Sequence, residues 1–128
     1  MSFSNTAETL VLNWLLTANS ATRPTAWYLA LYTAAPGEAG GGTEVTTVGT
    51  AYARQSAAFT VSGNTASNTS AIEFPTATAT YGTVSHVGVF DAVTGGNLIA
   101  YAALTTSKVI DTGDVLRFPT GDVDVTLD

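Results

Sequence analysis

Apolar residues alternate along two neighbouring stretches in the second half of the chain, which predicts a β-hairpin. The first strand is expected from Val84 to Asp91 and the second from Asn97 to Leu104. Between them, Thr94-Gly95-Gly96 supplies residues that readily adopt the positive φ angles of a tight turn. Both faces of each strand are largely apolar, so we expect the hairpin to lie centrally in a sheet that is covered on both sides.

Residues 5 to 18 have the spacing of an amphipathic helix. Asn5 and Glu8 are placed to form a capping box at its start. We expect this helix to pack on the sheet of its own chain, and the alternative is that the Trp14 side also meets a neighbouring subunit. The expected apolar stripe consists of Ala7, Leu10, Val11, Trp14, Leu15 and Ala18, widened by Leu12 and Leu16.

The remaining apolar runs are short and separated by Gly, Pro, Asn and Asp, which indicates strands joined by turns. Together they predict a single mainly β domain over residues 1–128, with one N-terminal α-helix and about seven or eight strands. We expect a β-sandwich or a jelly-roll-like barrel. The other expected strands are 26–33, 52–61, 71–75, 108–110, 114–118 and 122–128, whereas 38–48 is expected to be a loop and 64–70 a polar turn.

Charge is scarce, and this changes the expected surface. Charged residues make up 11% of the 128 residues, against about 25% in typical soluble domains. A surface of Thr, Ser, Ala and Gly packs against another protein without desolvating charges, so we expect a homo-oligomer, dimer or trimer, or an assembly subunit. The net charge of −6 with four Lys and Arg argues against a nucleic-acid partner.

The sequence has no cysteine, which excludes disulfides and thiolate chemistry. It shows neither a signal-peptide pattern nor an apolar run of the roughly 18 residues that a membrane span needs. We therefore expect no membrane partner and assembly in the cytoplasm.

The residues that carry chemistry are few and scattered. His86 lies in the middle of an expected strand, where the neighbouring Ser85 should point to the opposite face, so a structural role is favoured over catalysis. The acidic residues Asp122, Asp124 and Asp128 suit a solvated strand edge better than a metal site. For Arg54, a structural ion pair or carbonyl contact is favoured over ligand binding. The sequence predicts no catalytic residue, no cofactor, no metal and no enzyme.

Several stretches resemble a family of small tailed-phage virion proteins, which are tail-fibre-like or act as capsid cement (decoration) proteins. The resemblance covers nearly the whole chain, and its motifs are strand and turn signatures. It implies a small jelly-roll-like structural subunit without catalytic residues. The similar stretches are Trp27–Gly37, Tyr52–Ser56, Asn68–Pro75, Tyr81–Asp91, Thr94–Leu98, Leu104–Thr106 and the terminal Val125–Asp128.

Two functions follow from the resemblance. The favoured one is a capsid cement protein that binds the major capsid protein on the capsid exterior and stabilises the shell. The alternative is a tail-fibre or adhesion module that recognises a host surface glycan through exposed aromatics, with Tyr32, Tyr52, Tyr81 and Tyr101 as candidates. In either case the candidate interface residues are Trp14, Leu10, Tyr52 and Arg54.

Overall fold

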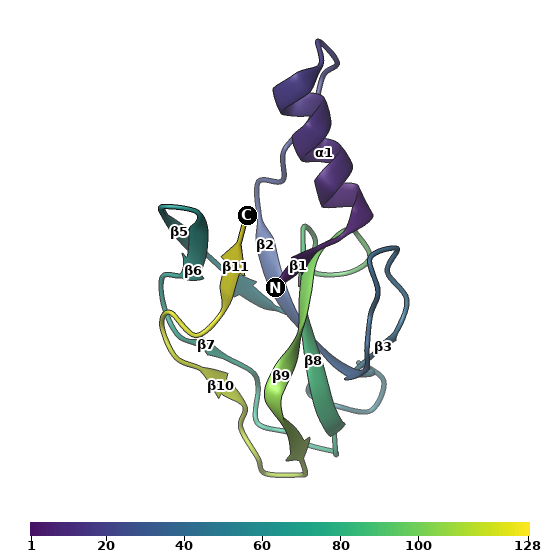
Figure 1. Ribbon diagram of the computed structural model, residues 1–128. Coiled ribbons are helices and arrows are strands. Elements are labelled where there is room, and N and C mark those ends of the chain that lie inside the picture. The colour runs from purple at the N-terminus through teal and green to yellow at the C-terminus, as the bar shows by residue number, and fades with distance from the viewer.

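A computed structural model describes residues 1–128 and shows a twisted antiparallel sheet from which one helix projects (Figure 1). The strand order of the main sheet is β1-β9-β8-β2-β3, and β4 pairs with β2 beside β3. The bounds are β1 Ser2–Phe3, β2 Trp27–Ala34, β3 Thr43–Glu44, β4 Gln55–Ala57, β8 Gly82–Phe90 and β9 Leu98–Ile110.

Two smaller antiparallel sheets form a partial second layer. One has the order β11-β6-β5 and the other pairs β10 with β7. The sheets do not close into a barrel, so the sandwich expectation is confirmed and the barrel alternative is not. The bounds are β5 Phe59–Ser62, β6 Thr65–Asn68, β7 Ile72–Glu73, β10 Arg117–Phe118 and β11 Asp124–Thr126.

The expected hairpin is the centre of the main sheet. β8 lies between β9 and β2 and pairs with β2 from Tyr28–Phe90 to Tyr32–His86. The turn between β8 and β9 has positive φ at Gly95 (61°) and Gly96 (71°), as its sequence predicts. A Cβ on Gly96 would lie 2.5 Å from an oxygen of Asp91, so glycine is required there for space as well as for conformation.

The main core lies between one face of this sheet and the second layer. Leu29, Leu31 and Val84 on the main sheet are fully buried against apolar side chains of the second layer. Aromatic rings connect the two layers, since Phe74 stacks on Tyr52 with ring centroids 6.0 Å apart and meets Phe118 edge-on at 6.3 Å. This packing uses the apolar stripe of β2 and β8 that alternation along the sequence indicates.

The opposite face of β8 and β2 is covered by a smaller cluster of buried residues, Ala30, Tyr32, Phe90 and Leu98. Gly88 allows this cluster to close over the strand, because a Cβ there would meet Leu98 at 2.8 Å. Both faces of the central strand are therefore covered, as predicted.

The helix α1 spans Asn5–Leu16, and its placement differs from the expectation. Its cap is Ser4, one residue before the predicted Asn5; the Ser4 hydroxyl accepts from the amide of Ala7. Ala7 is buried, Leu10 and Val11 are half-buried, and the last turn extends away from the sheets (Figure 1). The helix therefore packs on its own sheet only at its base, and the prediction is wrong for the outer part of the apolar stripe. No helix is long and apolar enough to cross a membrane.

Several strand predictions need correction. The run 52–61 is divided into β4 and β5, and residues 108–110 continue β9 instead of forming a strand of their own. The region 64–70, expected to be a turn, contains β6, and the loop 38–48 contains β3. The strands β3, β4, β5 and β6 are two to four residues long, and pairing of such short segments depends on distant partners rather than on a local pattern.

Gly96→Ala tests the geometry of the central turn. We expect the free energy of unfolding to fall by about 3 kcal/mol, because the substitution combines positive-φ strain with a clash against Asp91. Gly63→Ala is the control, since Gly63 has φ 62° and open space around it, and should cost about 1 kcal/mol. Urea denaturation measures both values; equal losses would contradict the role of the Asp91 contact.

Candidate functional site

The four candidate interface residues lie in two different environments. Trp14 and Leu10 belong to α1, with Trp14 70% exposed and Leu10 half-buried. Tyr52 is buried in the core, and the Arg54 side chain is 8% exposed. Tyr52 and Arg54 are therefore occupied by contacts within the chain, whereas the helix offers its side chains to solvent.

The outer half of α1 is the most apolar exposed segment of the molecule. We refer to Leu12, Trp14, Leu15 and Leu16 as the helix tip; these four side chains are between 57% and 76% exposed. Large apolar side chains gathered at one place on a surface mark an interaction site, whereas isolated ones do not.

The helix tip is apolar on two sides. Trp14 continues the row of Ala7 and Val11, which starts on the domain and runs beyond it. Leu12, Leu15 and Leu16 follow the spacing i, i+3, i+4 and form a second row. Exposed apolar rows on a helix normally pack against another surface. The tip therefore has the character of a segment that a partner covers.

A second apolar surface is a groove of about 460 Å³ between the main sheet and the β5-β6-β11 sheet. We call it the apolar groove. Its lining includes Trp27 and Phe59, and Val61 on its rim is 70% exposed. Ten of its 13 lining residues are hydrophobic and none is charged, so it suits an apolar side chain rather than a charged ligand.

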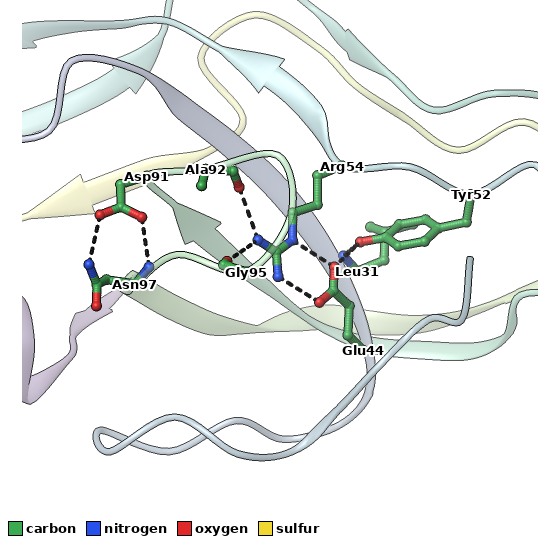
Figure 2. A network of polar contacts seen from close by, with 8 residues as sticks. All are labelled: Leu31, Glu44, Tyr52, Arg54, Asp91, Ala92, Gly95 and Asn97. Atoms are coloured by element: carbon green, nitrogen blue, oxygen red, sulfur yellow. Dashed lines mark hydrogen bonds and ion pairs between the residues drawn. The ribbon is translucent and has the colours of Figure 1, made fainter. Parts of the chain in front are cut away.

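Arg54 is the centre of the polar network on the opposite side of the sheet (Figure 2). Its guanidinium donates to both carboxylate oxygens of Glu44 at 2.8 Å, a bidentate ion pair. It also donates to the carbonyl oxygens of Ala92 (2.9 Å) and Gly95 (2.8 Å) in the β8–β9 turn. The expected ion pair and carbonyl contact are both confirmed.

The underside of the guanidinium rests on an aromatic ring. The Arg54 Cζ atom lies 3.6 Å from the centre of the Phe90 ring, within the range of a cation–π contact. With the ring below it and its hydrogen bonds satisfied by the protein, Arg54 has a structural role here.

Tyr52 completes this network from within the core. Its hydroxyl donates to Glu44 at 2.7 Å and accepts from the backbone amide of Leu31 at 3.1 Å. Leu31 lies on β2 between the segments paired with β3 and β4. The Tyr52 hydroxyl therefore fills a gap in the ladder where a buried amide would otherwise be left without a partner.

The network shifts the pKa values of its members in a consistent way. Burial alone would raise the pKa of Glu44, but the hydrogen bonds from Arg54 and Tyr52 outweigh it and lower that pKa. Burial, together with the neighbouring carboxylate, raises the pKa of Tyr52. Asp91 follows the same rule as Glu44: burial is outweighed by hydrogen bonds from Asn97, and its pKa is lowered. At neutral pH the Glu44 carboxylate is therefore charged, and the Tyr52 phenol beside it is neutral.

The prediction that Ser85 and His86 point to opposite faces of the strand is wrong. The Ser85 hydroxyl lies 2.8 Å from Nδ1 of His86, although alternation along a strand would place the two on opposite faces. A register shift between Val84 and His86 brings the neighbours together. No carboxylate bonds to the His86 ring, and no group of three metal-ligating side chains is present.

Two buried polar residues were not found from the sequence. Asn68 bonds through its side chain to Ser70, Pro119 and Val123, which joins β6 to the C-terminal segment. Ser4 donates to the carbonyl of Leu98 and so fixes the start of α1 on β9. A small polar residue directly before a helical pattern was the available signal for Ser4.

Trp14→Ala measures how far the domain depends on the helix tip. At protein concentrations that keep the chain monomeric, we expect the free energy of unfolding to change by less than about 1 kcal/mol, because Trp14 is 70% exposed. Leu29→Ala, at a fully buried position, is the control and should cost about 2–5 kcal/mol. A loss of that size for Trp14→Ala would instead place the indole in the core.

Glu44→Gln tests the ion pair through its pH dependence. Removing the charge leaves Arg54 buried without a counter-ion, and we expect a loss of about 3 kcal/mol at pH 7. Since the pKa of Glu44 is lowered on folding, its stabilisation is full above its unfolded value of about 4.3 and is lost as the pH falls through the folded value.

Thermal melts from pH 7 to pH 3 therefore should show a shallower acid loss for Glu44→Gln than for the wild type. The exposed Glu38→Gln variant is the control and should follow the wild-type curve. Parallel curves for all three proteins would contradict the coupling.

Comparison with known proteins gives the family of the chain. A family model described as "Podophage GP4 fiber I protein gp80" matches residues 2–126. No curated protein matches the chain. The predicted resemblance to small tailed-phage virion proteins is confirmed, and the fibre description is the one that the model carries. Because the match spans nearly the whole sequence, the chain belongs to the Podophage GP4 fiber I protein gp80 family and is a phage virion structural protein.

Proposed function

We propose that the protein is a non-enzymatic component of a phage fibre, and that α1 attaches its β domain to the rest of the assembly. The observation that carries this proposal is the projecting helix with four exposed apolar side chains at its tip. An attachment element needs exposed apolar surface on a defined secondary structure, because its burial supplies most of the binding free energy.

The family match supports the fibre function over the cement function, which was favoured from the sequence. A cement protein lies flat on a shell and makes broad contacts. Here the apolar surface is concentrated at the end of a projecting helix, which is better suited to insertion into a partner. Binding to the major capsid protein thus becomes the competing hypothesis.

Glycan recognition by the four candidate tyrosines receives less support. Tyr32, Tyr52 and Tyr81 are each at most 4% exposed, so their rings are not available as sugar platforms. Tyr101 is half-buried beside the small cluster on the second sheet face. We therefore propose a structural role within the fibre rather than receptor binding through these residues.

The test uses particles that lack the protein, to which purified protein is added back. Immunogold labelling should place the wild type on the tail fibres. Leu16→Asp should reduce the bound amount at least about tenfold, because it buries a charge in an apolar contact. Val48→Asp, at an 83% exposed valine outside α1, is the matched control and should bind normally. Gold over the head shell would favour the cement function instead.

A further inference from the structure

We propose that the helix tip of one copy binds the apolar groove of a second copy, and that the second copy returns its own tip to the groove of the first. The inference rests on the proposed function of α1 as an attachment element and names its partner. The association is a helix-in-groove contact made twice about a two-fold axis.

Both surfaces belong to the same chain and account for most of its exposed apolar residues. Of the ten large hydrophobic side chains that are exposed, four form the helix tip. Two more, Val61 and Leu127, line the apolar groove. The other four are scattered valines. Exposed apolar surface is therefore concentrated at two places that can cover each other.

The electrostatics of the two surfaces match. Residues 12–16 contain no charged side chain, and no charged residue lines the groove. The single acidic residue of α1, Glu8, lies in its first turn, away from the tip. Docking the tip in the groove thus desolvates no charge, which removes the main penalty of burying a surface segment.

The position of the groove relative to the helix favours a reciprocal arrangement. Phe3 precedes the cap of α1 and Trp27 begins the strand after it, and both line the groove. The groove therefore lies at the base of the helix, while the tip lies at its other end, about 18 Å away for 12 residues. Two copies with antiparallel helices place each tip at the base of the other.

The buried area also favours two contacts over one. A two-fold pair makes the tip–groove contact twice and so buries twice the area of a single contact. Because the stability of a complex depends on enough buried surface, this favours a closed pair of copies over a one-sided contact.

The first experiment uses the absence of cysteine in the chain. A Leu16→Cys/Val61→Cys double variant places one thiol on the tip and one on the groove rim. Mild oxidation should give a covalent dimer on a non-reducing gel. A Leu16→Cys/Val48→Cys variant is the matched control, since Val48 is also exposed but lies outside the groove, and it should remain monomeric.

The second experiment measures association with single-charge variants. The wild type should dimerise in sedimentation equilibrium. Leu16→Asp, which damages the tip, and Val61→Asp, which damages the groove rim, should each weaken the dimer at least about tenfold. In an equimolar mixture of the two variants, a heterodimer keeps one intact tip–groove contact but has both aspartates in the other contact, so it should associate more weakly than the wild type.

The outcomes separate this inference from the proposed function. A monomeric wild type at high concentration overturns the inference, as does a dimer that Leu16→Asp disrupts but Val61→Asp does not. If α1 variants still lose binding to the particles in either case, the attachment function stands with another partner. If the tip and groove pair two copies but the protein is absent from fibres, the proposed function fails and the inference stands.

Discussion

Arg54 joins three segments that are distant in the sequence, and the arrangement of the main sheet depends on this contact. Its ion pair holds Glu44, which brings β3 to the edge of β2, and its carbonyl contacts hold the turn between β8 and β9. The guanidinium is nearly fully buried on Phe90, so each of its partners is needed to offset the loss of water. The chain has few charged residues, and this ion pair links β3 to the turn between β8 and β9.

The parts of the fold that were predictable from sequence are those with strong local signals. Alternation identified the central hairpin, and glycine identified its turn, because both depend on the side chains and backbone of the segment itself. The type of contact at Arg54 was also foreseen. Its partners were not, since Glu44 lies 10 residues away and the turn carbonyls 38 and 41 residues away. Short strands such as β3 and β7 depend on similarly distant partners.

The helix was predicted from the sequence, but the surface that covers its apolar side was not. Its existence followed from spacing, yet the row of Ala7, Val11 and Trp14 has the same spacing whether it covers its own sheet or a partner. Only the base of the helix meets the domain, because Ser4 fixes the start of α1 on β9 and the outer half extends outward. The candidates Trp14 and Tyr52 are both aromatic residues in apolar segments, yet their environments are opposite. Trp14 is open to contact, and Tyr52 belongs to the interior.

The hydroxyl of Tyr52 has a consequence for strand pairing between separate molecules of the protein. A β-sheet edge with a free amide is a template for adding a strand from another molecule, and such addition leads to open-ended aggregates. On the β2 edge, the amide of Leu31 is already occupied by Tyr52 between the segments that β3 and β4 cover. A foreign strand therefore cannot pair with β2 in the gap between β3 and β4. Under the proposed pairing, copies would meet instead through the helix tip and the apolar groove, surfaces of limited size that can close into a finite assembly.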